Sequence, residues 1–384
     1  MILFLAASYF KFRGIFWRKP KFLFLFVFFA ALSSLFASPI QPAIYNFFRL
    51  VLLVFVSLAA ANCLRTGEVN MRGVARVLGF SAAIQATLGF MQFLKQGSLG
   101  LGFFGEPLIS PTADGVAKVV IGGAKLIRAY GTFPHPNILA AFLVIGFAAL
   151  VYLWLNRASE WKLWSSWRNL LSDLTLGVGI FVTSLGLLLS FSRSSWLVAT
   201  LLAAAVIIVG VVTKINFRQS IRLAILMLAI GLSLFIGFSE HVVTRAKIVP
   251  GEPALTQRAV YNDIGLEIIT ARPLGVGIGN QVLFADKQGF YESRGMTDDW
   301  QKQPIHNLYL LMATEIGIVG ALMFLLFIFR IISADSASLT LGALLLLGMT
   351  DHFLWTSQSG QLMLWLTIGL VIGLNRASSE GARS

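Results

Sequence analysis

A histidine stands in the short block Pro304-Ile305-His306-Asn307-Leu308-Tyr309, directly before a long apolar stretch near the end of the chain. Arg193 lies between two other apolar stretches, in Ser192-Arg193-Ser194, and Arg258 lies in a polar segment. Charged groups close to a bilayer are costly and persist where they are used. Histidine transfers protons near neutral pH, and guanidinium groups match phosphate oxygens. Together these residues predict a site that acts on a phosphorylated lipid.

The composition indicates a polytopic membrane protein. Hydrophobic residues make up 57% of the 384 residues and charged residues only 12%, whereas soluble domains carry about a quarter charged residues. The net charge of +13 fits cationic loops that face anionic lipid headgroups better than a surface for nucleic acid. The single cysteine, Cys63, excludes an internal disulfide and a cysteine-based metal cage.

The chain contains about ten apolar stretches near the length of about 20 residues that a membrane-spanning helix needs. These stretches are long and do not alternate with polar residues, which favours helices over strands. The predicted fold is an all-α, polytopic transmembrane bundle that forms one integral membrane domain over residues 1–384. The predicted spans are 22–38, 44–62, 74–94, 137–155, 174–191, 195–213, 221–238, 307–329, 337–353 and 360–375.

Basic residues gather at alternate ends of these spans, and the positive-inside rule places those ends in the cytoplasm. The opposite loops, which hold His306, Arg193 and Arg258, then lie outside the cytoplasm. The largest of them is 239–306, and its composition predicts an ordered segment. Within it, Arg258–Thr270 carries apolar residues at helical spacing, which predicts an amphipathic helix that lies on the bilayer surface.

Further polar residues lie at the same predicted face. Arg128 and Arg49 are candidates to widen a phosphate cradle or to face an acidic acceptor lipid. His135, between two prolines, favours a structural role, and Asn137 is the expected N-cap of its span.

A second group of residues follows the predicted surface helix. Gly275, Gly277 and Gly279 predict a tight backbone turn, because a dinucleotide fingerprint needs a different spacing in a strand–turn–helix context. Asp351 and His352 are expected to pair beside the site. The four histidines are not spaced as metal ligands, so no metal site and no cofactor are expected.

Several blocks, taken in order, resemble the bacterial O-antigen ligase and O-antigen polymerase family of membrane glycosyltransferases. The resemblance covers roughly residues 20–375. The resemblance implies about twelve spans, so about two are expected to be missing at the start. Met1–Phe10 is then expected to be the last part of a helix, or else to lie at the membrane interface. The blocks are Arg128-Ala-Tyr-Gly131-Thr132-Phe133-Pro-His135-Pro136-Asn137, Ser192-Arg193-Ser194, Arg258 with Pro273-Leu-Gly275-Val-Gly277-Ile-Gly279-Asn280, His306-Asn307-Leu-Tyr309, and Glu315-Ile-Gly317.

The resemblance implies a metal-independent, inverting transfer of a glycan from a polyprenyl (undecaprenyl) diphosphate to an acceptor hydroxyl such as that of lipid A core. It implies His306 as the general base on the acceptor, and Arg193 and Arg258 as the residues that hold the donor diphosphate. Arg128, Arg49, Asn307 and Tyr309 are candidate substrate-binding residues. The implied location is the bacterial inner membrane with a periplasmic site, among membrane lipids and without a nucleic-acid partner.

Two other functions remain open at this point. An O-antigen polymerase shares these blocks and differs in its acceptor, a second lipid-linked glycan. A transporter or flippase of lipid-linked glycans is the alternative of another class. Transporters often show paired halves and helices interrupted at mid-membrane, whereas this chain shows no internal repeat and its polar residues gather at one face.

Overall fold

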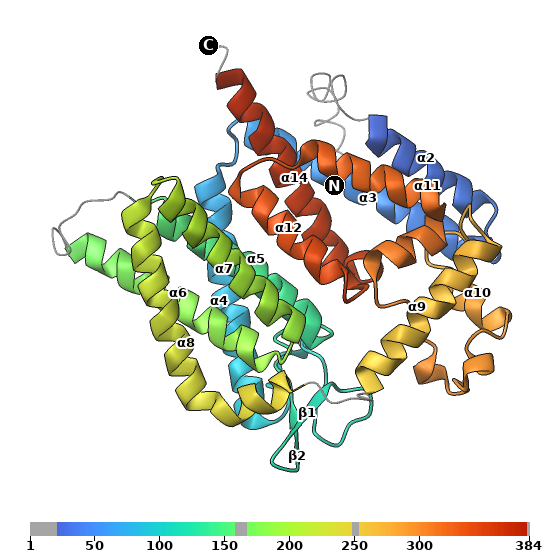
Figure 1. The fold of residues 1–384 in the computed structure, drawn as a ribbon, viewed down its shortest axis with the longest axis horizontal. Helices are drawn as coiled ribbons and strands as arrows, with labels where there is room; N and C mark the ends of the chain where they lie inside the picture. Colours follow the sequence, from blue (N-terminus) through green and yellow to red (C-terminus); the bar gives the residue numbers. More distant parts are fainter. Residues whose placement is uncertain (1–20, 158–166, 248–252, 382–384) are drawn as a thin grey trace. The chain divides into compact units, whose positions relative to one another are not determined.

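A computed structural model describes residues 21–157, 167–247 and 253–381, which are mainly helical (Figure 1). The chain divides into two compact units. Unit 1 combines Met1–Glu68 with Val249–Ser384, and unit 2 is Val69–Ile248. The helix expected at Met1–Phe10 lies outside the described residues.

Unit 1 brings helices from both ends of the chain together. Its elements are α2 (Lys21–Leu35), α3 (Ile40–Arg65), α9 (Pro253–Ala271), α10 (Gln281–Lys287), η3 (Glu292–Arg294), η4 (Asp299–Gln301), α11 (Leu308–Ile331), α12 (Ser336–Gly348), α13 (Phe353–Thr356) and α14 (Gln358–Gly381). α3 packs along α14, and α2 packs along α11. A Cβ added at Gly373 of α14 would lie 3.0 Å from the carbonyl oxygen of Ala61 in α3. Small residues allow this close approach, as is common between membrane helices.

Unit 2 is built around three mutually packed helices, α4, α5 and α6. Its elements are α4 (Met71–Lys95), η2 (Gly102–Phe104), β1 (Lys118–Ile121), β2 (Ala124–Ile127), α5 (Pro136–Leu155), α6 (Trp167–Leu189), α7 (Arg193–Val212) and α8 (Phe217–Ala246). A Cβ on Gly186 of α6 would lie 2.6 Å from the Cβ of Ala86 in α4. Glycine at this position therefore sets the spacing of the two helices.

Seven described helices have the length and hydropathy to cross a membrane: α3, α4, α5, α6, α7, α8 and α11. The prediction of about ten spans is therefore confirmed only in part. α2 and α12 occupy predicted spans but have 15 and 13 residues, short of the length of about 20 that a span needs. α14 is long enough, but Gln358 and Gln361 near its start lower its hydropathy. Large apolar side chains such as Ile236 and Phe329 are 78% exposed, as expected of side chains that meet acyl chains.

A two-stranded antiparallel sheet departs from the all-α prediction. β1 pairs with β2 through Val119 opposite Leu126 and Ile121 opposite Ala124. The turn between the strands is Gly122-Gly123, and both residues have positive φ, 56° and 81°. A two-residue Gly-Gly turn between short apolar runs is a hairpin signal. Each strand has only four residues, so the hairpin is a weak signal between the long apolar stretches 74–94 and 137–155.

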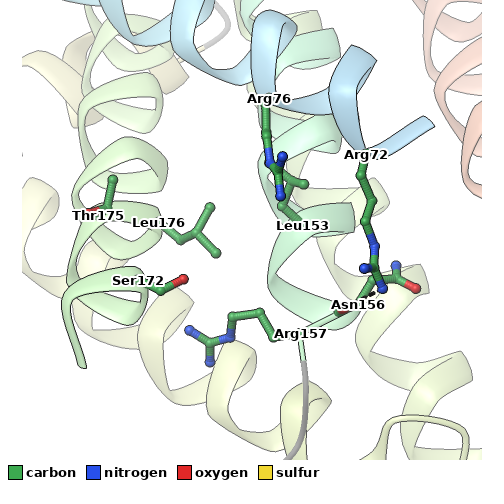
Figure 2. A pocket seen from close by; sticks show the side chains of 8 residues that line it. All are labelled: Arg72, Arg76, Leu153, Asn156, Arg157, Ser172, Thr175 and Leu176. Carbon is green, nitrogen blue, oxygen red and sulfur yellow. Dashed lines mark hydrogen bonds between the residues drawn. The ribbon is translucent and has the colours of Figure 1, made fainter. Parts of the chain in front are cut away.

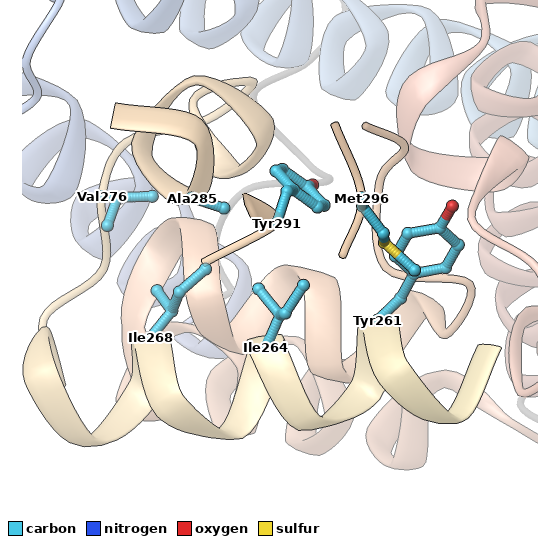
Figure 3. Packing of buried hydrophobic residues seen from close by; sticks show 7 residues of the cluster. All are labelled: Tyr261, Ile264, Ile268, Val276, Ala285, Tyr291 and Met296. Carbon is cyan, nitrogen blue, oxygen red and sulfur yellow. The ribbon is translucent and has the colours of Figure 1, made fainter. Parts of the chain in front are cut away.

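The helix predicted at Arg258–Thr270 is present as α9, and its apolar face packs against protein. Tyr261, Ile264 and Ile268 are 2%, 0% and 0% exposed. They form one apolar cluster with residues from the following segment, namely Val276, Ala285, Tyr291 and Met296 (Figure 3). Residues 276–296 therefore cover the face that was expected to contact lipid, and the placement of α9 on the bilayer surface stays a prediction.

The start of the predicted loop 239–306 also shifts. The span predicted to end at residue 238 reaches a non-helical residue there, Phe238, with φ −134° and ψ 29°. The chain then continues as helix to Ala246. The helix therefore bends at Phe238, where the loop was expected to begin. The helical turns after this kink contain His241 and Arg245.

Candidate functional site

The glycine run after α9 fits against a break in α11. Gly317 interrupts that helix with φ 80° and ψ 160°. The backbone N–H groups of Val276 and Gly277 donate to the carbonyl oxygens of Thr314 and Glu315 at 3.0 and 2.9 Å, and Ile318 N–H donates to Pro273. The run therefore bonds carbonyl groups that the break leaves without helical partners. The predicted tight turn is confirmed by positive φ values at Gly275, Gly277 and Gly279.

His306 lies just before α11, held between two rings. Its imidazole stacks on the ring of Tyr261 in α9, with centroids 5.3 Å apart and planes 14° apart. The ring of His352 stands nearly perpendicular to it at 4.8 Å. α9, the start of α11 and the segment before α13 thus fix the orientation of this histidine.

The tautomer of His306 follows from its backbone contact. Nδ1 lies 2.9 Å from the carbonyl oxygen of Pro304. A carbonyl oxygen only accepts, so Nδ1 carries the proton in the neutral ring. Nε2 then holds a lone pair, which is the arrangement that a general base requires.

The surroundings of His306 keep it neutral. Burial lowers its pKa to about 4, and positive charge on His352 and Arg258 lowers it as well, while Asp351 opposes the shift. Burial also lowers the pKa of His352. At neutral pH His306 is therefore available to accept a proton.

Arg49 reaches the same cluster from α3. Its Nε donates to Gln361 Oε1 at 2.5 Å, and its Nη2 donates to the carbonyl oxygen of Thr356 at 3.2 Å. The hydroxyl of Thr356 lies 2.7 Å from Nδ1 of His352. The structure thus connects Arg49 to His306 through Thr356 and His352.

Arg258 is the second cation of the cluster. It lies on α9, one turn before Tyr261. Its charge lowers the pKa of both His306 and His352, so it lies near both rings. Arg49, Arg258 and His306 are therefore gathered within unit 1. The expected pairing of Asp351 with His352 takes a different form, because Asp351 Oδ1 accepts from the backbone N–H of His352 at 2.8 Å.

Asn307 and Tyr309 make local contacts. Asn307 is the N-cap of α11, and its side chain accepts from the N–H groups of Tyr309 and Leu310 at 3.0 and 3.1 Å. The hydroxyl of Tyr309 donates to the carbonyl oxygen of Leu345 at 2.7 Å. These contacts account for both residue types structurally, and a role in substrate binding stays a prediction.

A polar cavity of about 230 Å³ shares Pro304 and Thr356 with the contacts of the histidine cluster. Asn46, Gln281, Glu315 and Trp355 also line it. Glu315 is 3% exposed, accepts from Trp355 Nε1 at 2.7 Å, and is 3.4 Å from the backbone nitrogen of Gln281. The cavity therefore offers amide and carboxylate groups beside an aromatic ring.

Arg193 belongs to unit 2, where it is the first residue of α7. The turn before it contains Phe191, a fully buried residue with φ 50°. Nε of Arg128 donates to the carbonyl oxygen of Ser190 at 2.6 Å, and Nε of Arg245 donates to that of Phe191 at 3.0 Å. Two arginines thus bind carbonyl groups of the turn that connects α6 to α7.

The contacts of Arg128 also correct the expected start of α5. Nη2 of Arg128 donates to Asn137 Oδ1 at 2.6 Å. The N-cap of α5 is His135, whose Nδ1 accepts from the N–H of Asn137 at 3.2 Å. Asn137 is therefore not the cap. Its amide oxygen is used by Arg128 instead, and the structural reading of His135 agrees with this contact.

Sequence reasoning missed several residues of these clusters. Arg245 falls within the predicted loop 239–306, whereas the structure places it in the last turn of α8. Thr356, Gln361 and Gln281 carry no distinctive spacing. Tyr261 belongs to the apolar spacing of the predicted helix Arg258–Thr270, and that spacing gives no sign of its stacking on His306.

One comparison with known proteins gave a match. The O-antigen ligase family model matches residues 178–325, which include Arg193, Arg258 and His306. No curated protein and no solved structure matches the chain. The matched family indicates a function of the O-antigen ligase or polymerase type, in which a membrane enzyme transfers a lipid-linked glycan to a glycan acceptor. Over residues 178–325, the chain is therefore similar to the O-antigen ligase family, in agreement with the resemblance predicted from the sequence blocks.

Proposed function

We propose that this protein transfers a glycan from a polyprenyl diphosphate carrier to a hydroxyl group of an acceptor such as lipid A core, without a metal ion and with inversion at the anomeric carbon. The observation that carries the proposal is His306, a partly buried and neutral imidazole with Nδ1 bonded to Pro304 and Nε2 left as an acceptor. Two cations of the same cluster, Arg49 and Arg258, support a phosphorylated donor, because guanidinium groups match phosphate oxygens.

His306 acts on the acceptor. Nε2 takes the proton of the acceptor hydroxyl, and the oxygen attacks the anomeric carbon from the face opposite the diphosphate. The new bond between carbon and the acceptor oxygen forms as the bond to the diphosphate oxygen breaks, and that oxygen keeps the electron pair. The pKa near 4 favours the neutral base in the free enzyme. An anionic donor nearby would raise that pKa and strengthen the base when substrate is bound.

The arginines act on the leaving group. A guanidinium stays charged and offers fixed N–H groups to phosphate oxygens. Arg258 carries charge beside the histidines, and Arg49 is positioned by Gln361 and Thr356. Charge that grows on the departing diphosphate is stabilised by cations already in place. Arg193 is assigned to the same diphosphate by the family resemblance.

The polar cavity next to the cluster suits a sugar. Sugar hydroxyl groups need polar partners. Asn46 and Glu315 line the cavity with oxygen atoms that can accept, while Asn46 Nδ2 already donates to Pro42 and Gln281 Nε2 to Tyr291. Trp355 offers an apolar ring face, although its Nε1–H is used by Glu315. We assign this cavity to a sugar residue adjacent to the reacting bond.

The test is a reaction with purified protein in detergent. The donor is a polyprenyl-diphosphate glycan, supplied alone or with a lipid A core acceptor, and the products are identified by mass spectrometry. Transfer to lipid A core supports the proposed ligase, while elongated lipid-linked glycan from donor alone indicates a polymerase. Absence of any covalent product with both substrates contradicts an enzymatic role and favours a transporter.

A matched pair of histidine variants tests the base. His306→Ala should lower kcat at least about 100-fold, within the range expected for loss of a general base, while donor binding stays within a few-fold. His135→Asn is the control, because asparagine is also a good N-cap and should leave activity near that of the wild type. Near-normal turnover in His306→Ala removes this residue from the mechanism.

Chelation tests the proposed reliance on cationic side chains. Turnover should be unchanged after treatment with EDTA, because the arginines supply the charge that a divalent ion supplies in metal-dependent transferases. Loss of turnover that Mg²⁺ or Mn²⁺ restores contradicts the metal-independent mechanism.

A further inference from the structure

Unit 2 contains a second cationic site, distant in the sequence from the blocks discussed above. A cavity of about 590 Å³ opens between the first turns of α4, the end of α5 and the start of α6. Three arginines line it: Arg72, Arg76 and Arg157 (Figure 2). By the positive-inside pattern, this end of the helices faces the cytoplasm. None of these three arginines belongs to the proposed catalytic site.

Two of these arginines occupy unfavourable positions for helix stability. Arg72 and Arg76 lie four residues apart in the first two turns of α4. Like charges at this spacing repel each other, and the N-terminal end of a helix carries positive partial charge. Among the described residues, Arg72 donates only to the carbonyl oxygen of Asn156, at 3.3 Å, and Arg76 has no hydrogen-bond or ion-pair partner. An anion in the cavity would turn this repulsion into attraction.

The third arginine is rigidly held. The side chain of Arg157 is 12% exposed and forms an ion pair with Asp173. Its guanidinium lies 4.4 Å from the ring centroid of Trp154, and its Nη2 lies 3.4 Å from Gln219 Oε1. Burial lowers its pKa, and so does the charge of Arg222. Asp173 balances one of these cations, so positive charge remains in excess.

The lining of the cavity also suits a phosphate ester. Ser172 and Thr175 of α6 also line the cavity, and Asn156 lines it beside Arg72 (Figure 2). Together with the arginine forks, these groups provide donors of the kind that phosphate oxygens accept. The shared chemistry of the ligand is therefore that of a phosphate monoester or diester.

The apolar surroundings favour a lipid over a free phosphate. Leu153 and Leu176 line the cavity itself. On α4, Phe80 follows Arg76 by one helical turn and is 70% exposed, and on α6 Leu174 is 55% exposed. Acyl chains could lie on these side chains while the headgroup occupies the cavity.

We propose that this cavity binds the phosphate headgroup of an anionic membrane lipid through Arg72, Arg76 and Arg157. Basic pockets between membrane helices on the cytoplasmic side are suited to anionic lipids. The site is separate from the donor and acceptor of the proposed reaction, so it is measured by lipid binding and not by turnover.

The experiment is native mass spectrometry of the purified protein in neutral detergent, with either phosphatidylglycerol or phosphatidylcholine added at equal concentration. Wild-type protein should retain phosphatidylglycerol in preference. Each arginine near a membrane surface contributes about fivefold to the binding of an anionic lipid. Arg72→Gln combined with Arg76→Gln should therefore lower retention about 25-fold. Arg330→Gln is the control, because Arg330 lies at the end of α11 in unit 1, at the same predicted membrane face, and does not line the cavity.

Two further measurements test the proposal independently, one with a single arginine variant and one with inorganic phosphate as competitor. Arg76→Gln alone should lower retention about fivefold. This side chain is exposed and has no hydrogen-bond or ion-pair partner within the described part of the chain, so its replacement should not disturb folding. Inorganic phosphate at millimolar concentration should compete weakly. Equal retention of both lipids, or unchanged retention in the double variant, overturns the proposal. Complete displacement of the lipid by inorganic phosphate assigns the site to a soluble phosphate and also overturns it.

Discussion

The pH dependence of transfer offers a sharp test of His306, because its surroundings set an unusual pKa. Burial, His352 and Arg258 lower that pKa to about 4, against the opposing charge of Asp351. At pH 5 a histidine with a pKa of 4 is about 90% neutral, whereas one with the ordinary value of about 6.5 is about 3% neutral. The difference in available base is about thirtyfold. We therefore expect kcat/KM to stay nearly constant from pH 8 to pH 5.

The assay measures kcat and kcat/KM of purified protein between pH 8 and pH 5, with recovery checked by a return to pH 7.5. kcat/KM reports the free enzyme, and kcat reports the enzyme with bound substrate. A bound diphosphate raises the pKa of a nearby histidine, so the decline of kcat in acid should begin at a higher pH than that of kcat/KM. A kcat/KM that halves near pH 6.5 and then falls tenfold per pH unit refutes the reasoning from burial.

Two further predictions concern single residues. Arg193→Lys should lower turnover strongly although the charge is kept, because lysine lacks the planar fork. Arg330→Lys is the control for this change, and full activity in Arg193→Lys would show that Arg193 is only a surface charge. Gly317→Ala should destabilise the protein by roughly 2 kcal/mol or more, because its φ is 80° and the new Cβ would lie 2.8 Å from backbone atoms of Pro273 and Leu274. Gly342→Ala in α12 is the matched control, since its Cβ meets nothing within 4 Å and helix propensity favours alanine. Thermal unfolding checks this pair, and equal melting temperatures would contradict the proposed role of the break in α11.

The membrane helices were predictable because long apolar runs allow little else in a bilayer. The lengths of the individual helices were harder to predict from the sequence. The stretch 337–353 reads as one span, yet its helix ends at Gly348, and residues 353–356 form the separate short helix α13. The hairpin could have been predicted, because Gly122-Gly123 is a typical two-residue turn. The covering of α9 by residues 276–296 could not have been predicted, because an amphipathic helix shows the same periodicity whether its apolar face contacts lipid or protein.

The site was predictable in kind but not in its contacts. Arg258 and His306 could be predicted as site residues, because charged and titratable side chains beside apolar stretches indicate function. The approach of Arg49 to Thr356 joins residues 307 positions apart in the chain, and no local pattern encodes such a contact. The pKa of His306 likewise depends on Tyr261, His352 and Arg258, which reach it only through the packing of three separate segments.

The proposed reaction requires that His306 and Arg258 lie outside the cytoplasm. Cysteine labelling tests this orientation, and the structure indicates which positions suit the cysteine. Segment 253–306 is expected outside the cytoplasm, so a cysteine placed there should react with a membrane-impermeant thiol reagent in intact spheroplasts. Asp286 is a poor position for it, because its carboxylate pairs with Lys302 at 2.7 Å. Thr297 is exposed and avoids that ion pair.

Thr297→Cys in a Cys63→Ser background should therefore label before the membrane is opened. Val69→Cys, at an exposed site between α3 and α4 on the opposite predicted face, should label only after permeabilisation. The pair controls for reagent leakage, because leakage labels both positions. Labelling of Val69→Cys alone in intact cells would place His306 and Arg258 in the cytoplasm. Transfer from a glycan delivered to the outer leaflet would then be excluded, because base and donor would lie on opposite sides of the bilayer.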